Sequence, residues 1–374
     1  MRSRPITLLL AAVAICCSSL VAPVASASTG PKVTRLVLGN SSAYQPKAQP
    51  GTTDDYHCTL LDPHVRHDSF ITSSQFKPGS LEDHHAALFL VPPTIAAAAR
   101  RHHQINTGWT CFGEAALPGT TLAQFLKNPF LSEWAPGHGA DRLPQGTGIR
   151  LPKGSLVIIQ VHYNLLVGHR PVRNTLVLDT VPANSDLEPL TINLALAPPD
   201  IPCPEGVTGP LCSEPAALAN LGVRFGPDAV MQATGIERLC GEDPANPPIS
   251  TTARCITKAS RTGWIVRTQA HMHLLGTGFS MVLDPGTPQA KTVLSVPHYS
   301  FDDQRAYNLA RPIHVVKGQP LEITCTYDPN LSRRLPLLRK TSPHLVTWGD
   351  GSTDEMCIGL AWVAPSLPRT RHRS

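Results

Sequence analysis

Short apolar segments separated by proline and glycine dominate this chain and limit the folds that it can adopt. The 374 residues include 37 prolines and 27 glycines, and only 16% are charged, which excludes a coiled coil or a long-helix protein. The hydrophobic share of 41% is too high for a disordered chain. Alternating or β-branched runs of strand length occur at 86–91, 156–163, 175–181, 191–196, 263–268, 279–283 and 321–327. This pattern predicts an all-β chain of sandwich type.

Helical periodicity is scarce, and only residues 95–101 and 120–127 are expected to form short helices. The chain is longer than a single core usually fills, so we expect two domains that meet in the polar stretch 182–189. Residues 198–255 are rich in proline and glycine and hold four cysteines, which predicts a disulfide-stapled insertion at the start of the second domain. The expected organisation is a flexible lead-in at 28–53, an N-terminal domain at 54–185, a C-terminal domain at 186–365 and a basic tail at 366–374.

The first 27 residues have the features of a secretory signal peptide. Arg2 and Arg4 precede an apolar run, and small residues at 25–27 form a cleavage site. A short membrane anchor is a weaker alternative, as is a lipoprotein anchor on Cys16 or Cys17. No later window is long and apolar enough to span a bilayer. We therefore expect a secreted protein, extracellular or periplasmic, that has no membrane contact after signal removal.

The charge of the chain does not favour a nucleic-acid partner. The 32 basic residues, two of them in the signal peptide, nearly balance the 27 acidic ones. Pairs such as Arg100-Arg101 and Arg333-Arg334 are short and lack the interleaved aromatic residues that stack on bases. We expect both pairs to lie on a solvated surface. The oligomeric state is not predicted.

Eight cysteines remain after the signal peptide, and an even number in an exported chain predicts up to four disulfides. Eight cysteines allow about 105 sets of disulfide pairs, so spacing can favour one set but cannot establish it. The spacing favours two local bridges and two that close longer loops. The expected pairs are Cys203–Cys212 and Cys240–Cys255, with Cys58–Cys111 and Cys325–Cys357. No C-x-x-C motif of a zinc ribbon is present, so sulfur from cysteine is not expected at a metal.

The sequence His271-Met272-His273 is the strongest candidate for a metal site, because it follows a predicted strand. Residues at i and i+2 of a strand lie on the same face, so both imidazoles can reach one metal while Met272 points to the other side. Met356 is the candidate third ligand, since a thioether is a soft ligand that suits Cu(I). Most methionines, however, are simply core residues.

A second group of histidines lies in the first domain. His162 ends an apolar strand, and His84-His85 precede another. The adjacent pair can reach one metal only if a bulge or strand end redirects one ring. His84, His85 and His162 would then form a three-imidazole site suited to zinc or copper. A buried histidine satisfied by a single hydrogen bond is the alternative. The remaining histidines, including His57, lie in turn-like, edge or terminal contexts and are expected at the surface.

Several further short motifs occur in a fixed order between about Asp54 and Val363. They are Tyr56-His57-Cys58, His84-His85, Trp134-Ala135-Pro136, the run at 143–150, Gln160-Val161-His162-Tyr163, His271-Met272-His273 and Asp354-Glu355-Met356-Cys357. The ordered set resembles the copper type II, ascorbate-dependent monooxygenases, the family of peptidylglycine α-hydroxylating monooxygenase and dopamine β-monooxygenase. The resemblance implies two jelly-roll-like β-sandwich domains, each of which holds one copper ion.

The resemblance also implies a role for each candidate residue. The electron-transfer copper would be bound by His84, His85 and His162, and Gln160 matches a family residue near that site. The oxygen-activating copper would be bound by His271, His273 and Met356, which form the catalytic site. Ascorbate or a similar reductant would reduce both coppers, and O2 would then hydroxylate an aliphatic C–H of a small-molecule substrate.

Some positions depart from the family pattern. Peptide-amidating members have an arginine two residues before the H-x-H motif, and an asparagine and a tyrosine after the methionine. Here those positions are Gln269, Ile358 and Leu360, so a glycine-extended peptide is not the expected substrate. The family partner of Cys255 would follow Met356, where this chain has no further cysteine after Cys357, which again indicates Cys240 as the partner.

Three functional hypotheses remain from the sequence. The first is a secreted dicopper monooxygenase, and the second is a non-catalytic copper-binding protein for sequestration or delivery. A catalyst needs an open position and a substrate cavity near Met356, whereas a carrier does not. The third, a zinc hydrolase built on the histidines of the first domain, leaves Met356 and the H-x-H pair unexplained.

Overall fold

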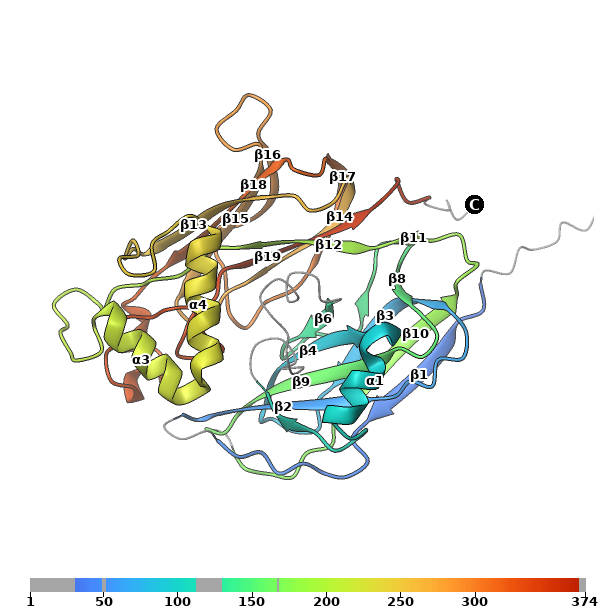
Figure 1. The fold of residues 1–374 in the computed structure, drawn as a ribbon, viewed down its shortest axis with the longest axis horizontal. Coiled ribbons are helices and arrows are strands. Elements are labelled where there is room, and N and C mark those ends of the chain that lie inside the picture. Colours follow the sequence, from blue (N-terminus) through green and yellow to red (C-terminus); the bar gives the residue numbers. More distant parts are fainter. Residues whose placement is uncertain (1–30, 49–51, 112–129, 167, 370–374) are drawn as a thin grey trace, which may run out of the picture.

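Four β-sheets form the framework of the described chain, which confirms the predicted all-β, sandwich-like fold (Figure 1). The computed structural model describes residues 31–48, 52–111, 130–166 and 168–369. The expected signal peptide and the expected helix at 120–127 lie outside these residues. Within the described residues, strands up to Pro189 form two of the sheets and strands from Thr191 onward form the other two. We call these the N-terminal and the C-terminal halves.

The N-terminal half pairs a six-stranded sheet with a five-stranded sheet. The six-stranded sheet has the order β1 (Thr34–Gly39), β10 (Thr175–Pro182), β3 (Ser69–Lys77), β8 (Thr147–Leu151) and β11 (Glu188–Pro189), with β7 (Asp141–Arg142) also paired to β3. The five-stranded sheet has the order β5 (Trp109–Thr110), β2 (Asp54–Leu61), β9 (Leu156–Asn164), β4 (Asp83–Val91) and β6 (Phe130–Trp134).

The C-terminal half consists of two four-stranded sheets. One has the order β12 (Thr191–Leu196), β19 (Ile358–Ala364), β14 (Gly263–His271) and β17 (Tyr307–Val315). The other has the order β13 (Thr252–Lys258), β18 (Pro320–Tyr327), β15 (Gly276–Leu283) and β16 (Lys291–Val296). All of the pairings in this half are antiparallel.

Alternation along β9 separates a core face from a site face. Val157, Ile159 and Val161 are buried in the core between the two N-terminal sheets. Residues Leu156 and Ile158 point to the opposite face, where they pack beneath helix α1 (Pro93–His102). Because alternate residues of a strand lie on one face, Gln160 and His162 lie on the same face as Leu156 and Ile158.

The two halves are joined through apolar packing. Val266 on β14 and Trp362 on β19 belong to the same buried cluster as Val161 and Leu88 of the N-terminal half. A separate cluster fills the space between the two C-terminal sheets, with Ile265, Ala361 and Met272 among its members. The sheet that contains β14 and β19 therefore packs on both of its faces.

Two helices lie within residues 198–255 and were not expected from the sequence. They are α3 (Glu214–Phe225) and α4 (Pro227–Leu239), and they pack over β12 beside the C-terminal half (Figure 1). Each begins with proline in its first turn, a position that tolerates a missing backbone N–H. Prolines and glycine in this segment therefore lie at the ends of helices, and their number does not indicate a loop without helices. Two short turns follow later, α5 (Leu331–Arg334) and η1 (Leu338–Lys340).

The expectation of a flexible lead-in at 28–53 is wrong for residues 34–39. These residues form β1, which pairs antiparallel with β10 over six positions from Thr34 to Gly39. Leu36 and Leu38 pack on the N-terminal core, whereas Val37 between them is 65% exposed. The alternation of buried and exposed residues is short and belongs to an edge strand. Because polar residues flank it, the sequence pattern did not predict a strand here.

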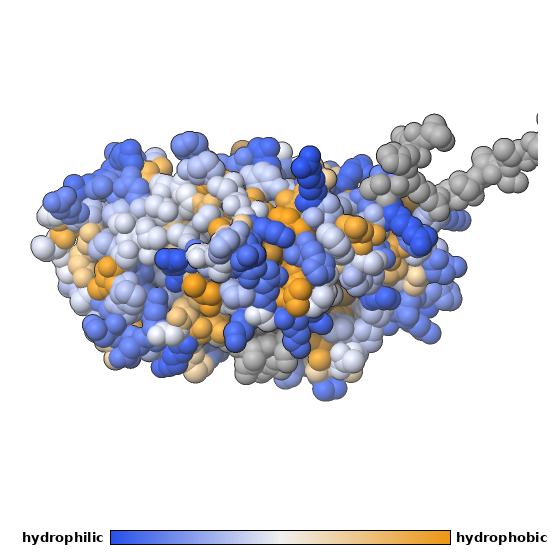
Figure 2. Space-filling view, turned by 90° about the horizontal axis from the view of Figure 1, so that it is seen from above, coloured by the Kyte–Doolittle hydropathy of each residue, from blue (hydrophilic) through white to orange (hydrophobic). Residues whose placement is uncertain are grey.

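The structure contains the four disulfides that the sequence analysis expected, Cys58–Cys111, Cys203–Cys212, Cys240–Cys255 and Cys325–Cys357. Disulfides persist outside the reducing cytosol, so their number favours an extracellular or periplasmic protein. No helix of the described residues has the length and apolar character needed to cross a bilayer. On the face seen in Figure 2, hydrophobic residues form small groups between hydrophilic ones.

We expect Ile159→Ala to lower the free energy of unfolding by about 2–5 kcal/mol, because it leaves a cavity in the centre of the N-terminal core. The matched control is Val37→Ala on the exposed side of β1, which we expect to change it by about 0.5 kcal/mol or less. Denaturant unfolding of both variants measures the difference. Equal losses would contradict the assignment of the core face of β9.

Candidate metal centres

The first histidine set is built by the pairing of two strands. His85 on β4 lies directly opposite His162 on β9 in the antiparallel ladder. The register shifts between Asp83 and His85, so His84 occupies a bulge, as the sequence analysis required for both adjacent rings to reach one point. One nitrogen each of His84, His85 and His162 lies within 4.8 Å of the others.

The hydrogen bonds of the three rings leave Nδ1 of each imidazole available to a metal ion. The Nε2 of His162 lies 2.9 Å from Oδ1 of Asp54, and the Nε2 of His85 lies 3.0 Å from Nε2 of Gln304. The Nδ1 of His84 is buried and has no hydrogen-bond partner among the described residues. Buried nitrogens without partners are costly unless something binds them. The set therefore fits a metal ion held through Nδ1.

Groups around His162 fix its orientation. The ring stacks on Tyr56 of β2, with ring centroids 4.4 Å apart and an interplanar angle of 4°. The hydroxyl of Ser352 donates to Oδ1 of Asp54 at 3.2 Å, which ties the C-terminal half to this set. Burial alone would raise the pKa of Asp54, but the charge and hydrogen bond of His162 outweigh it, so that pKa lies below its ordinary value. An oriented carboxylate behind an imidazole is typical of metal-binding histidines.

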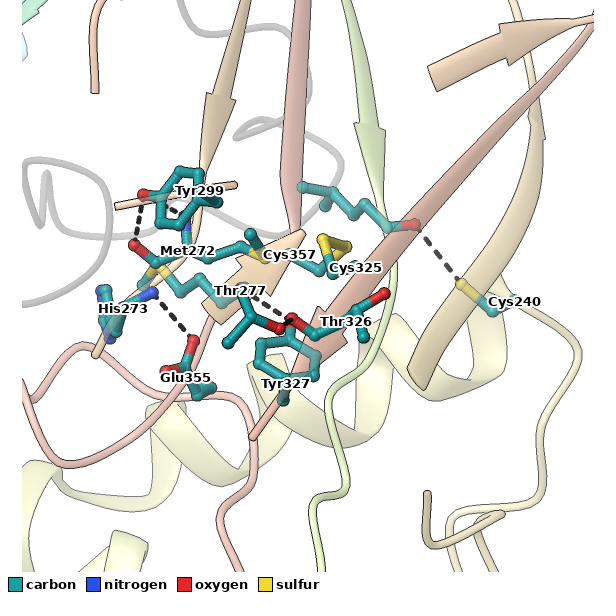
Figure 3. Close-up of a disulfide and its surroundings, with 12 residues drawn as sticks. Cys240, Met272, His273, Thr277, Tyr299, Cys325, Thr326, Tyr327, Glu355 and Cys357 are labelled. Carbon is teal, nitrogen blue, oxygen red and sulfur yellow. Dashed lines mark hydrogen bonds between the residues drawn. A yellow bond between two sulfur atoms is a disulfide. The ribbon is translucent and has the colours of Figure 1, made fainter. Parts of the chain in front are cut away.

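The second set lies at the end of β14, which extends to His271. His273 follows two residues later, just beyond the strand, and both imidazoles line one cavity. Met272 between them is fully buried in the C-terminal core, on the opposite side. The Tyr299 hydroxyl donates to the Met272 carbonyl at 2.7 Å and accepts its N–H at 2.9 Å (Figure 3). This clamp holds the H-x-H backbone in place.

Met356 is held by its neighbours on both sides. Cys357 is bridged to Cys325 of β18, and the Tyr327 hydroxyl donates to the Met356 carbonyl at 3.0 Å. The buried carboxylate of Glu355 accepts the backbone N–H of His273 at 2.8 Å (Figure 3). It also accepts the backbone N–H of Leu275 at 2.6 Å. These contacts connect the loop of Met356 directly to the H-x-H segment.

Helix α3 supports the same loop. Both guanidinium nitrogens of Arg224 donate to the carboxylate of Asp354, at 2.8 and 2.5 Å, and the pair is largely buried. The backbone carbonyl of Asp354 lies 3.1 Å from Nδ1 of His273. Because Nδ1 of His273 and Nδ1 of His271 both have partners, Nε2 is the free nitrogen of each ring. The second set therefore presents two Nε2 atoms and a thioether.

Gln304 and Glu133 connect the two sets. The amide oxygen of Gln304 lies 2.5 Å from Nδ1 of His271, and its amide nitrogen donates to Nε2 of His85. Glu133 on β6 lies 3.2 Å from the same Nδ1 of His271. The ring of Phe301 packs against His84, His85 and His273, with centroids 4.6–5.7 Å apart. The two sets are therefore neighbours across the junction of the two halves.

The environment keeps most of these imidazoles neutral. Burial and the neighbouring histidines lower the pKa of His84 to about 3 and that of His85 well below its usual range. Burial and the charge of His271 do the same to the pKa of His273. For His271, burial lowers the pKa, but Glu133 outweighs it and the net shift is upward. Neutral imidazoles are the form that binds metal ions.

One cavity of about 540 Å³ reaches both sets. Its polar lining includes His85, His162, His271, His273 and Gln160, together with Met356. Its apolar wall comes from both halves and includes Phe89, Phe130, Leu194, Ile358, Leu360 and Trp362. Gln160 lies on the site face of β9, where its Nε2 donates to Sγ of Cys111 at 3.7 Å. This arrangement places ligand-type side chains beside space for a small molecule.

Three residues that contact the histidines were not predicted from the sequence. Gln304, Glu133 and Asp54 reach the histidines from other elements, so no local spacing marks them. The expectation that His57 lies at the surface is wrong. Its ring is buried on β2 and stacks on Tyr44 at a centroid distance of 3.5 Å.

Residues 243–364 match the family described as copper type II ascorbate-dependent monooxygenase, C-terminal domain. This segment, about a third of the chain, is therefore similar to the C-terminal domain of the copper type II monooxygenases. The matched range includes His271, His273 and Met356, together with both cysteines of the Cys325–Cys357 bridge. The expected family resemblance is thus confirmed. The N-terminal histidine set lies outside the matched range.

No curated protein matches the chain. Among solved structures, the major capsid protein P2 from bacteriophage PM2 is 7% identical, with 91% of this chain and 99% of that chain covered and a TM-score of 0.34. Allantoicase is 10% identical over 76% and 77% of the two chains, with a TM-score of 0.17. Both TM-scores are too low to carry an argument about fold or function.

We expect Arg224→Met to lower the free energy of unfolding of the protein by about 3–5 kcal/mol, because it leaves the buried carboxylate of Asp354 unpaired. The matched control is Arg254→Met, which removes an exposed ion pair with Glu322 and should cost about 1 kcal/mol or less. Denaturant unfolding of both variants tests this. A loss no larger than that of the control would show that the pair does not hold the Met356 loop.

Proposed function

We propose that this protein is a secreted dicopper monooxygenase that hydroxylates an aliphatic C–H of a small organic substrate. The observation that carries the proposal is one cavity lined by Met356 and by residues of both histidine sets: His85 and His162 of the first, and His271 and His273 of the second. A copper carrier has no need of an apolar chamber beside its ligands, whereas a catalyst requires one. The cavity therefore favours the enzyme over the non-catalytic copper-binding protein.

We propose that His84, His85 and His162 hold one copper ion through Nδ1, and that His271, His273 and Met356 hold the other. Imidazole binds copper in both oxidation states, and a thioether favours the reduced ion. When bound, copper supplies the one-electron redox chemistry that lets O2 react with an unactivated C–H. Overall, the substrate C–H, O2, two electrons and two protons give an alcohol and water, with an ascorbate-type reductant as the electron source.

The protein's own contribution is to orient the ligands. Asp54 holds the ring of His162, and Gln304 with Glu133 holds that of His271. These partners fix which nitrogen of each ring faces the cavity.

We propose a substrate with an apolar reacting part. Ile358 and Leu360 line the same cavity as Met356. They occupy the two positions at which peptide-amidating members of the family have an asparagine and a tyrosine. The amide nitrogen of Gln269 donates to Glu133 and to the Gln304 carbonyl, so it is not available to bind a substrate. A hydrocarbon or aromatic group fits this wall better than a peptide carboxylate does.

We expect Met356→Ile to reduce substrate-dependent O2 uptake to background, while the set of His84, His85 and His162 still binds one copper per chain. The reason is that the thioether is lost from the second set only. Met231→Ile is the matched control, since Met231 on α4 is 63% exposed, and it should keep full activity. Copper content and ascorbate-dependent O2 uptake, with a panel of small amines, aromatics and peptides, are the measurements.

Full activity of Met356→Ile would end the assignment of Met356 as a ligand. Two coppers in the unmodified protein with no coupled turnover across the panel would instead support the copper-binding protein.

A further inference from the structure

Three acidic side chains meet in the interior of the C-terminal half. None of them lines the cavity that the histidine sets share. Asp200 follows β12, Glu214 is the first residue of α3, and Glu237 lies in the last turn of α4. They are only 3%, 7% and 1% exposed. One carboxylate oxygen from each lies within 4.8 Å of the other two.

Most of these carboxylate oxygens have no hydrogen-bond donor among the described residues. Both oxygens of Asp200, both of Glu214 and Oε2 of Glu237 are buried and unpartnered. Arg238, the residue after Glu237 on α4, donates to the carbonyl and hydroxyl of Thr234 and makes no hydrogen bond to these carboxylates. Buried carboxylates without donors or a counter-charge strongly destabilise a fold. Something other than the protein's own donors must therefore neutralise them.

Protons and a metal ion are the two candidates for this role. Burial and the neighbouring acids raise the pKa of Asp200 to about 8 and that of Glu237 to about 7. A proton shared by Asp200 and Glu214 would relieve one charge, but it donates to only one oxygen and leaves the rest without a partner. A cation, in contrast, interacts with all three groups at once.

We infer that Asp200, Glu214 and Glu237 bind a calcium ion that fastens α3 and α4 to the C-terminal half. The set contains only hard oxygen ligands, which suit calcium and not copper. Calcium–oxygen bonds of about 2.4 Å allow ligand oxygens on opposite sides of the ion to be roughly 4.8 Å apart. Magnesium binds at shorter distances and retains several waters, which a buried set of carboxylates does not favour. Millimolar calcium outside cells would supply the ion to a protein with four disulfides.

The position of the acidic set gives the ion a structural role. Cys240, one turn after Glu237, is bridged to Cys255 on β13, so a covalent link and the ion would secure the same end of α4. Phe225 of α3 and Ala233 of α4 pack in one cluster with Met356. Stabilising these two helices therefore also stabilises the apolar surroundings of Met356.

The test is a calcium titration of the full mature protein after all metals have been removed, with calcium chloride as the probe. We expect calorimetry to give one calcium per chain and the Tm to rise by roughly 5 °C at a concentration about 100 times the Kd. The double variant Asp200→Asn with Glu237→Gln should lose at least about ten-fold in calcium affinity and show no Tm rise. Glu205→Gln, an exposed acid in the same segment, should behave like the unmodified protein.

Several outcomes would overturn the inference. A Tm that does not respond to calcium, with no binding heat, would mean that the three acids share protons instead. Binding of magnesium or manganese at these residues without binding of calcium would refute the choice of ion. If the double variant does not fold, the single variant Glu214→Gln gives the same readouts. Unchanged calcium affinity in that variant would place the ion elsewhere.

Discussion

The antiparallel pairing of β4 with β9 is the constraint on which the candidate site depends. It places His85 opposite His162, and the bulge at His84 turns a third ring toward the same point. A one-residue slip in this register would move the imidazoles to the other face of the sheet and expose the core residues. The apolar residues of the opposite face, Val157, Ile159 and Val161, oppose such a slip because they are fully buried. Core packing thus sets the geometry of the histidines.

In the C-terminal half, the candidate ligand Met356 is far in sequence from His271 and His273, so other contacts must bring its loop to the H-x-H segment. Cys357 is bridged to Cys325, Glu355 accepts two backbone N–H groups from the H-x-H segment, and Arg224 pairs with Asp354. These contacts act on residues one or two positions from Met356, and the Tyr327 hydroxyl bonds the Met356 backbone carbonyl, so none of them acts on the thioether. A thioether makes no strong directional contact of its own, so its position is determined by the backbone that carries it.

Much of the fold and of the candidate site could be predicted from the sequence. The strands, the H-x-H pair and the need for a bulge at His84-His85 follow from a period of two and from local composition. Helices α3 and α4 were missed because proline and glycine at their ends gave the segment the composition of a loop. Glu133 and Gln304 could not be found, because they reach His271 only once the two halves are packed together. Contacts that depend on long-range packing leave no mark in local spacing.

The most direct test of the central claim is a crystal structure of the copper-loaded protein with anomalous diffraction data collected at the copper edge. The account predicts two copper peaks in the shared cavity, one at Nδ1 of His84, His85 and His162 and one beside Nε2 of His271 and His273 with the sulfur of Met356. A single peak, or peaks outside this cavity, would contradict it.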